Sequence, residues 1–332
     1  MITLETHLDD GHGPDAADLA AVVCAVAAAG VTIADELARA ALIGQLGTTG
    51  DTNVQGEKVK KLDVWANDVV VAALDATGRA CTLVSEEMEE IRHRPERCTA
   101  SRYVVCFDPV DGSSNLDVNG IVGTIFSVLP RRDAGPNHAR ADVLQPGTAQ
   151  VAAGYIMYGP STVLVLTTGD GVHGFTLDRA RGAWVRTHTN VRIPARGRTY
   201  SINDGNFARW PEGVRRFVEH VRAIDVATGR PYTARYAGSL VMDAHRTLLE
   251  GGIFLYPEDA AGSGKQSTGK LRLMYECSPM GLLMEQAGGA ASTGRARILD
   301  LTPASPHQRV PLLIGSPEDV RLAEEFCAAR RA

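Results

Sequence analysis

Two acidic runs are the segments of this sequence best suited to chemistry. The first run, 85–87, follows the apolar segment 80–84, and the second, 108–114, follows the apolar segment 103–107. Short apolar segments like these predict buried strands, and α/β folds place their sites where such strands end. Carboxylates gathered there repel one another and need a cation, and oxygen-only ligands suit Mg²⁺ or Mn²⁺. The four carboxylates are Glu86, Glu87, Asp108 and Asp111.

The second run also contains donors that suit a phosphate. Gly112, Ser113 and Ser114 offer backbone N–H groups and hydroxyls in sequence. Asp-Pro and Asp-Gly alone are ordinary turn signals, but the preceding strand and the upstream glutamates favour a metal site. Metals beside a phosphate cradle indicate metal-assisted phosphoryl chemistry, with water rather than a side chain as the attacking group.

The downstream half supplies groups that a phosphate ester needs. Arg235 comes just before a predicted helix over 239–250, so an arginine and a helix N-terminus can meet at one anion. Lys270 and Arg272 lie two residues apart, and Glu276 follows one helical turn later. By itself the spacing of Arg272 and Glu276 is that of an ordinary surface ion pair. Tyr236 and Tyr256 could either pack in the core or contact a ligand, and the sequence favours neither role.

Composition limits the class of protein. The chain has 332 residues, 44% hydrophobic residues and a net charge of −5. It is long enough for two domains or one large α/β unit, and it has no basic footprint for nucleic acid. The uncharged segment 19–34 is short for a membrane span and favours a packed helix. The N-terminus lacks a basic region typical of a signal peptide. The six cysteines are scattered, which favours reduced thiols in a cytoplasmic protein.

The helices and strands that position these groups are predicted from the periodicity of apolar residues and from the glycines and prolines that interrupt it. Two helices are expected over 18–30 and 33–46, joined near Gly30, and a third over 58–76 carries Asp63. Consecutive antiparallel strands are expected over 150–158, 161–168 and 171–177. The Pro- and Arg-containing link 191–198 is the expected domain boundary. Beyond it the pattern predicts strands over 199–202, 252–256 and 310–315, and helices over 211–227, 239–250, 271–287 and 317–330.

Taken together, these motifs resemble class I fructose-1,6-bisphosphatases, within the magnesium-dependent, lithium-sensitive phosphatase superfamily. The Asp-Pro-x-Asp-Gly-Ser run marks the superfamily, and the Gly-Gly-Ile-Phe-Leu-Tyr-Pro run narrows the resemblance to sugar bisphosphatases. The motifs occur in family order over most of the chain. The matching segments are 60–64, 83–87, 104–115, 123–126, 145–147, 152–155, 234–239, 251–257, 270–276 and 307–309.

The resemblance implies roles for individual residues. The metal ligands would be Glu86, Asp108, the Val110 carbonyl, Asp111 and Glu276. Asp63 and Glu87 would help deprotonate the attacking water. The 1-phosphate would lie against Asp111, Gly112, Ser113 and Ser114. The sugar and the 6-phosphate would be bound by Asn203, Tyr236, Tyr256, Lys270 and Arg272, with Arg235 reaching in from a neighbouring subunit.

The resemblance also implies the whole-molecule properties. The expected fold is α/β, with α-β-α-β-α layers in two mixed-sheet domains, 1–192 with the metal-binding carboxylates and 193–332 with the sugar-phosphate site. The expected activity is hydrolysis of the 1-phosphate of fructose 1,6-bisphosphate in gluconeogenesis or the Calvin cycle. Two or three Mg²⁺ ions per site are expected, with Mn²⁺ as a substitute. The expected assembly is a cytoplasmic homotetramer that binds neither nucleic acid nor membrane.

Departures from the family pattern leave alternatives open. Asn206 stands where many relatives carry a tyrosine, and the loop 257–269 is longer than usual. A sedoheptulose-1,7-bisphosphatase, or an enzyme that accepts both sugars, is therefore a second reading. A non-catalytic sugar-phosphate-binding paralogue is a third, and the complete carboxylate set argues against it. The segment 15–20 matches the stretch that binds AMP in regulated relatives, but it has acidic side chains and no hydroxyl.

Overall fold

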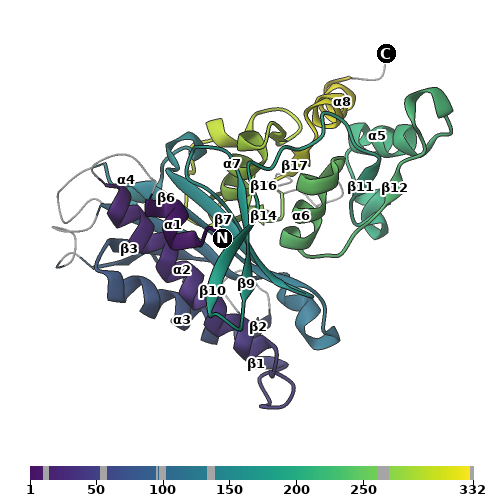
Figure 1. The fold of residues 1–332 in the computed structure, drawn as a ribbon. Coiled ribbons are helices and arrows are strands. Elements are labelled where there is room, and N and C mark those ends of the chain that lie inside the picture. The colour runs from purple at the N-terminus through teal and green to yellow at the C-terminus, as the bar shows by residue number, and fades with distance from the viewer. Residues whose placement is uncertain are drawn as a thin grey trace.

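Helices and sheets alternate in five layers (Figure 1). The computed structural model describes residues 1–9, 15–52, 58–94, 96, 102–132, 139–259 and 269–329. Helices α1 (Leu4–Asp9), α2 (Ala16–Leu37) and α3 (Lys61–Thr77) form the first layer, against an eight-stranded sheet. Helices α6 (Leu240–Glu250) and α7 (Ser278–Gln286) lie between that sheet and a five-stranded one. Helices α5 (Glu212–Arg222) and α8 (Pro317–Ala328) form the last layer. The expected α-β-α-β-α fold is confirmed.

The eight-stranded sheet is almost entirely antiparallel. Its order is β10-β9-β8-β7-β6-β5-β3-β4, and only β3 and β5 pair in parallel. Its central strands are buried along their whole length because helices cover both faces. The strands are β3 (Ala80–Ser85), β4 (Arg92–His93), β5 (Tyr103–Asp111), β6 (Val122–Pro130), β7 (Ala152–Tyr158), β8 (Thr162–Thr167), β9 (His173–Asp178) and β10 (Ala183–His188).

The five-stranded sheet is mixed and lies entirely in the second half of the chain. Its order is β12-β11-β13-β17-β15, with β11 parallel to both neighbours and β17 antiparallel to both of its own. The strands are β11 (Thr199–Ser201), β12 (Thr233–Ala234), β13 (Ile253–Tyr256), β15 (Ala290–Ser292) and β17 (Leu312–Gly315). Two short ladders complete the structure: β1 (Thr48–Thr52) with β2 (Lys58–Lys60), and β14 (Leu271–Arg272) with β16 (Arg309–Val310).

The predicted pair of helices over 18–30 and 33–46 is wrong. Helix α2 runs unbroken from Ala16 to Leu37, and turns follow it. A Cβ built on Gly30 would lie 2.2 Å from the Cδ1 of Ile156 on β7, so this glycine permits close packing of helix on sheet and does not end the helix. By length and apolar composition α2 could cross a membrane, but it packs against α1, α3 and the sheet.

Other elements also differ from those predicted. The helix predicted over 58–76 is strand β2 followed by α3. The helix predicted over 271–287 is strand β14, a π-helical turn over Leu273–Cys277 and then α7. Strand β10 was not predicted at all. Each error arises where tertiary pairing overrides a short local pattern.

The cysteine expectation is also wrong at one position. Cys81 on β3 is disulfide-bonded. Cys24, Cys106, Cys277 and Cys327 are free, as expected. The spacing of the cysteines gives no indication of this bond, because no close motif marks it.

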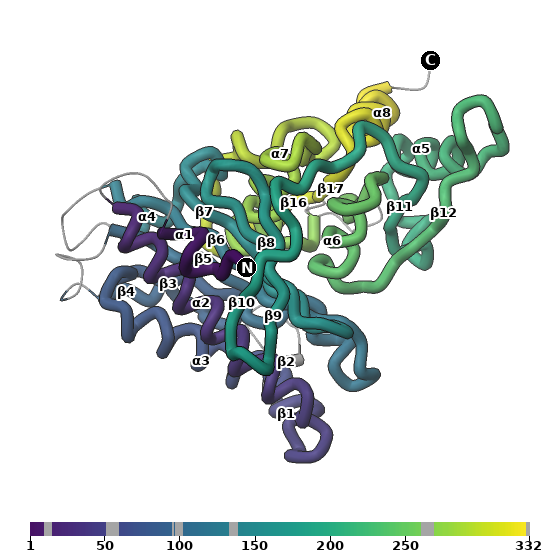
Figure 2. The backbone as a smooth tube through the Cα atoms, in the orientation of Figure 1, coloured from purple at the N-terminus to yellow at the C-terminus, as the bar shows by residue number. Residues whose placement is uncertain are grey.

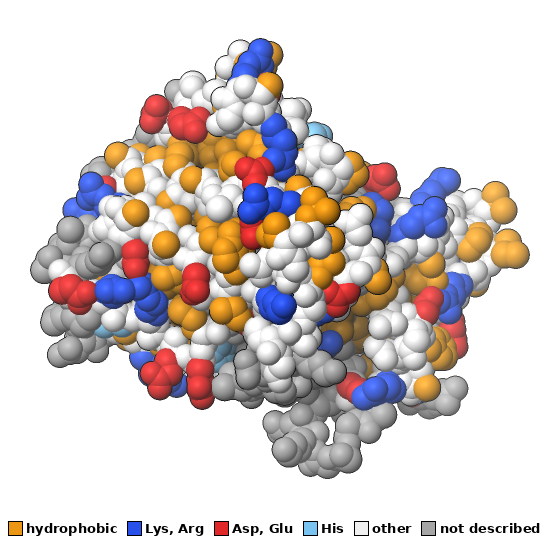
Figure 3. Space-filling view, turned by 90° about the horizontal axis from the view of Figure 1, so that it is seen from below, with side chains coloured by type: hydrophobic (Ala, Val, Ile, Leu, Met, Phe, Trp, Pro, Cys, Tyr) orange, Lys and Arg blue, Asp and Glu red, His pale blue; other side chains and the backbone are white. Residues whose placement is uncertain are grey.

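The first residues of the chain lie beside β10, where Thr3 forms a bridge with Val185, and α8, the last described helix, lies at the upper right of the view (Figure 2). On the face drawn in Figure 3, Lys and Arg side chains are interspersed with Asp and Glu side chains. Within the described residues of that face, no continuous basic area is present.

Candidate active site

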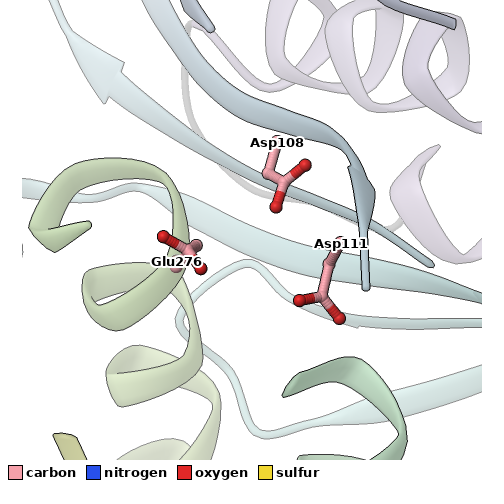
Figure 4. A group of neighbouring side chains, drawn as sticks. All are labelled: Asp108, Asp111 and Glu276. Carbon is pink, nitrogen blue, oxygen red and sulfur yellow. The ribbon is translucent and has the colours of Figure 1, made fainter. Parts of the chain in front are cut away.

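Three buried carboxylates converge where β5 ends (Figure 4). Asp108 and Asp111 belong to β5, which continues four residues beyond its predicted end, and Glu276 comes from the π-helical turn before α7. One oxygen from each of the three lies within 4.8 Å of the others. A bulge in the pairing of β5 with β6 falls between the two aspartates, and bulges of this kind re-aim side chains. Residues 165 positions apart in the chain thus share one site.

Asp111 connects the two domains as well as belonging to this cluster. Ser239 donates its hydroxyl to Asp111 Oδ2 at 2.8 Å, and the Val241 N–H donates to the same oxygen at 2.8 Å. Ser239 is also the N-cap of α6, where its hydroxyl accepts from Met242. The carboxylate of Asp111 therefore caps the positive end of a helix from the second domain.

A buried arginine holds the remaining acids in place. The Arg272 guanidinium lies 2.7 Å from Glu86 and 3.9 Å from Glu276, and its backbone N–H donates to Glu276 at 2.6 Å. Arg272 is only 4% exposed and Glu276 only 3%. The Arg272–Glu276 pair is therefore part of the site and not the ordinary surface pair that its spacing alone would suggest.

Burial leaves the carboxylate cluster short of positive charge. Burial first, and repulsion from neighbouring carboxylates second, raise the pKa of Asp108 well above its usual value. Burial likewise raises the pKa of Glu276, and raises that of Asp111 to about 6 against the hydrogen bonds from α6. Acids in this state are stabilised by a cation. An oxygen-only donor set with spare negative charge fits Mg²⁺ or Mn²⁺.

Asp63 lies at the same cavity in a state suited to accepting a proton. Burial raises its pKa to about 7, while hydrogen bonds from Ser113 and from the Lys60 backbone act in the opposite direction. Its Oδ1 has no hydrogen-bond partner among the described residues. A buried acceptor whose pKa lies near neutrality is what general-base chemistry at neutral pH requires.

The predicted phosphate cradle packs tightly against α6. Gly112 has φ +78°, and a Cβ built there would lie 2.7 Å from the Cβ of Ser239. Residues 113–118 then form a short 3₁₀ turn. Only glycine suits this position, since the backbone is left-handed and the neighbouring helix leaves no space.

One cavity of about 660 Å³ collects nearly all the residues that the sequence singled out. Of those predicted residues, all of which the structure describes, only Arg235 is outside its lining. Arg235 is exposed on the surface, where its guanidinium donates to the Ala234 carbonyl. The predicted residues that line the cavity are Asp63, Glu86, Glu87, Asp108, Val110, Asp111, Gly112, Ser113, Ser114, Asn203, Tyr236, Tyr256, Lys270, Arg272 and Glu276.

Several lining residues were given no role from the sequence, and three of them are Ser239, Asp243 and Lys60. Ser239 positions Asp111, Asp243 accepts from the Ala237 and Gly238 N–H groups, and Lys60 pairs with Asp117. For Ser239, a signal was available, because it precedes a predicted helix and suits an N-cap. No local pattern marks the other two.

Comparisons with known proteins agree along the whole chain. Two family models match: "Fructose-1-6-bisphosphatase, N-terminal domain" over residues 4–189 and "Fructose-1-6-bisphosphatase, C-terminal domain" over 193–328. The class 1 fructose-1,6-bisphosphatase of Chlorobium chlorochromatii is 48% identical, covering 100% of this chain and 99% of its own. The corresponding Synechocystis protein is 49% identical over 96% and 89%.

Solved structures show the same relationship. The holo form of Leishmania major fructose-1,6-bisphosphatase superposes with a TM-score of 0.90 at 38% identity, covering 98% of each chain. The T-state structure of the same protein gives a TM-score of 0.86 at 37% identity, covering 98% of this chain and 99% of that one.

Proposed function

The chain belongs to the fructose-1,6-bisphosphatase family, and on that premise we propose that it hydrolyses the 1-phosphate of fructose 1,6-bisphosphate to fructose 6-phosphate and phosphate. One observation carries the proposal. The buried cluster of Asp108, Asp111 and Glu276 lies in the same cavity as the 112–114 cradle and the predicted sugar-phosphate residues. With the 1-phosphate bound at the cradle, the acidic cluster would lie beside the group that reacts.

Different residues of the chain would bind the phosphate and accept the proton from water. The Gly112, Ser113 and Ser114 donors would hold the oxygens of the 1-phosphate. Asp63 would accept a proton from water through its unpartnered Oδ1, and Glu87 lines the same cavity as a second acceptor. The bond between phosphorus and the C1 oxygen breaks as the water oxygen bonds to phosphorus. The C1 oxygen takes up one proton and leaves as an alcohol, which balances the proton that the attacking water gives up.

The carboxylate cluster would hold the metal. Glu86, Asp108, Asp111, Glu276 and the Val110 carbonyl are the proposed ligands, and the raised pKa values of the buried acids support a bound cation. When bound, Mg²⁺ would acidify water and offset the charge on the phosphoryl oxygens. Arg272 keeps Glu86 and Glu276 oriented toward this position.

The far end of the cavity would bind the rest of the substrate. Asn203, Tyr236, Tyr256 and Lys270 are proposed to contact the sugar and the 6-phosphate, since they line the wall away from the cluster. We propose that Arg235 completes this site in a neighbouring subunit of a homotetramer, because it is exposed and outside its own cavity.

A division into domains 1–192 and 193–332 is supported by the two separate sheets. A cytoplasmic location is proposed from the family resemblance, and α2, the one described helix long and apolar enough to cross a membrane, packs within the fold.

A phosphate-release assay tests the proposal. The purified protein is incubated with fructose 1,6-bisphosphate, with and without Mg²⁺, and with excess chelator. We expect one phosphate per sugar, fructose 6-phosphate as product, and no release in chelator. Release without divalent metal, or release of both phosphates, would contradict the proposal. Binding of the sugar without any release would identify a non-catalytic paralogue.

A further inference from the structure

The segment 235–238 connects β12 to α6 and contains Arg235 and Tyr236, two of the residues proposed to bind the far phosphate (Figure 1). This segment belongs to no helix or strand. The strand before it, β12, is two residues long, and both residues are exposed. A backbone hydrogen bond from the Arg235 N–H to the Tyr200 carbonyl, at 3.0 Å, attaches the start of the segment to β11. The position of Tyr236 therefore depends on the contacts that hold the rest of the segment.

A carboxylate from α6 binds the backbone of this segment. Asp243 accepts from the Ala237 N–H at 3.0 Å and from the Gly238 N–H at 3.3 Å. Gly238 has φ +77°, and a left-handed residue of this kind lets successive N–H groups point at one anion. Asp243 is fully buried, and it lines the same cavity as Tyr236. The chain thus binds its own carboxylate next to a residue proposed to contact the substrate.

The bonds of Asp243 differ from ordinary capping of a helix. Ser239 is the N-cap of α6, and in a capping box the acid at the third helical position accepts from the N–H of the N-cap. Asp243 is the fourth residue of α6, and its partners are the two residues before the N-cap. An acid that only complements the helix dipole can remain exposed in the first turn. Asp243 instead fixes the segment that leads into the helix.

Arg246, nearly one turn further along α6, holds Asp243 and the segment together. Its guanidinium donates to Asp243 Oδ1 at 2.9 Å and to the Arg235 carbonyl at 3.4 Å. The Arg246 side chain is 13% exposed, so water and salt screen the pair only weakly. Removing one member of a buried pair leaves the other charge without compensation. One helix therefore fixes backbone groups at both ends of the segment.

The segment is also attached to the turn that carries the phosphate cradle. Asn115 follows Ser114 directly in the chain, and its side-chain amide donates to the Ala237 carbonyl at 3.3 Å. Ala237 is thus held through its N–H by α6 and through its carbonyl by the cradle turn. Tyr236 is the residue next to it, so loss of the Asp243 contact would let Tyr236 move relative to the cradle.

We propose that Asp243, held by Arg246, is a positioning residue that fixes Tyr236 at the distance from the phosphate cradle that the far phosphate of the substrate requires. Asp243 acts through the backbone and not on the reacting atoms. It also fixes the backbone beside Arg235, which would act in a neighbouring subunit. The proposal rests on the proposed function, because the roles of Tyr236 and the cradle belong to that function.

The kinetic test compares two substrates that differ only in the far phosphate. Fructose 1,6-bisphosphate and fructose 1-phosphate are assayed with the wild type and Asp243→Asn. Asparagine keeps the size of the side chain but lacks the charge that binds two N–H groups and a guanidinium. We expect kcat/KM for the bisphosphate to fall roughly tenfold, as for lost hydrogen bonds to a charged group, and mainly through KM. The value for fructose 1-phosphate should change less than about twofold, because that sugar lacks the far phosphate.

Asp142→Asn is the matched control. Asp142 is also fully buried, accepts the Arg132 N–H at 2.8 Å and pairs with Arg131 at 3.2 Å. It is not among the residues that line the active cavity. Asp142→Asn should therefore lower the free energy of unfolding, as Asp243→Asn does, without changing the ratio of kcat/KM between the two substrates.

The dependence on Mg²⁺ separates positioning from damage to the helix. The start of α6 also donates to Asp111 of the carboxylate cluster, through Ser239 and Val241. General loosening of α6 would therefore raise the Mg²⁺ concentration that gives the half-maximal rate. We expect this concentration to be the same in Asp243→Asn and the wild type. A rise in it, or an equal loss of kcat/KM with both substrates, overturns the proposal.

Calorimetric titration with fructose 6-phosphate measures the same contact without turnover. We expect the Kd to rise roughly tenfold in Asp243→Asn and to stay unchanged in Asp142→Asn. An unchanged Kd in Asp243→Asn, or no binding to the wild type, overturns the positioning role. If the wild type does not hydrolyse fructose 1,6-bisphosphate, the proposed function fails, and this titration alone decides the role of Asp243.

A second variant covers the case in which Asp243→Asn does not fold. Arg246→Lys keeps the positive charge but loses the forked guanidinium that contacts both Asp243 and the Arg235 carbonyl. We expect the Kd for fructose 6-phosphate to rise by a smaller factor in this variant. Wild-type affinity in Arg246→Lys would then overturn the proposal.

Discussion

At the level of single residues, the decisive property of the site is charge that the protein alone does not neutralise. Asp108, Asp111 and Glu276 are all more than nine-tenths buried, and Arg272 is the cation placed among them. Burying acids without full compensation costs stability unless a cation or protons complete the site. The acids therefore lower the stability of the protein by an amount that the proposed metal ion would offset.

The first prediction concerns Asp108. Asp108→Asn removes one negative ligand while keeping the shape of the side chain, and its Oδ1 can still accept from the Val110 N–H at 3.0 Å. We expect hydrolysis of fructose 1,6-bisphosphate to fall by ~100-fold or more, as for losses at metal sites. The Mg²⁺ concentration that gives the half-maximal rate should rise. Steady-state rates over a Mg²⁺ series provide the measurement, and near-normal turnover would show that Asp108 is not a ligand.

The second prediction concerns the acid stability of the fold. His245 on α6 pairs through Nδ1 with the Tyr155 hydroxyl at 2.8 Å, and burial lowers its pKa from 6.5 to about 4, with a smaller contribution from His188. Between these values the unfolded chain binds the proton and the folded chain does not. The contribution of neutral His245 to the free energy of unfolding is fully present above about pH 6.5. This contribution, roughly 3 kcal/mol, is lost as the pH falls toward 4.

Denaturant unfolding of the wild type and of His245→Gln across this pH range measures the effect. Glutamine keeps a polar partner for Tyr155 but does not titrate. We expect the free energy of unfolding of the variant to fall less steeply between pH 6.5 and pH 4. Parallel curves for the two proteins would assign the acid sensitivity to other groups.

The sequence predicts the site at this scale because the groups lie in short, dense runs. Asp108, Asp111 and the cradle are adjacent in the chain, so their proximity can be predicted without knowing the fold. The role of Arg272 could not be read in the same way. Its spacing from Glu276 fits an exposed helical pair, and only the ladder of β14 with β16 brings it into the interior.

At the level of elements, close packing decides what local patterns leave open. Gly30 resembles a helix breaker in sequence, yet it lies in the middle of α2. Ile156 on β7 fills the space that a side chain would need. Single-sequence patterns predict most strands and helices here because apolar segments are long. They fail where a two-residue strand or one glycine depends on a distant neighbour.

The third prediction tests this contact. Gly30→Ala gains about 1 kcal/mol of helix propensity but places a methyl group against the fully buried Ile156. We expect overpacking to dominate, with a net loss on the order of 1–2 kcal/mol in the free energy of unfolding. Ile156→Val removes the offending Cδ1 and should restore part of the loss in the double variant. Additive effects in the double-mutant cycle would show that the two positions do not interact.

At the level of the whole molecule, the two sheets meet through one shared helical layer. Helices α6 and α7 contact both sheets, and each begins at or beside an acid of the cluster. The relative position of the two sheets therefore sets the geometry of the acids. The link 191–198, predicted as a domain boundary, falls between β10 of the first sheet and β11 of the second. The capping of α6 by Asp111 depends on tertiary structure and has no signal in the sequence.

The fourth prediction concerns assembly. Arg235 is exposed and outside its own cavity, so its proposed role requires a second copy of the chain. Arg235→Ala and Asp108→Asn should each be weakly active alone. After subunit exchange, hybrids should contain some sites with both residues intact, and activity should reappear. Phosphate release before and after mixing provides the measurement, and an absence of recovery despite verified exchange contradicts a role across the interface.

The last prediction concerns regulation, which in AMP-sensitive relatives acts through the start of the first long helix. Here Asp15 and Asp18 stand at the start of α2, and both lie near Arg102, at 2.9 Å and 3.9 Å. Asp18 also pairs with Arg79 at 3.2 Å, and the Tyr103 hydroxyl donates to the Asp15 carbonyl at 3.1 Å. The basic and hydroxyl groups that could meet a phosphate are thus already engaged.

Two acids at that position also repel a dianion, although the helix N-terminus by itself attracts one. We expect AMP to inhibit weakly or not at all. Asp15→Ser with Asp18→Thr removes both charges and adds hydroxyl donors, so it should increase whatever sensitivity exists. Inhibition curves at saturating Mg²⁺ measure both proteins. Half-inhibition of the wild type at low micromolar AMP would contradict this expectation. It would show that a working site exists despite the two acids, and that their exposed ion pairs are too weak to exclude the nucleotide.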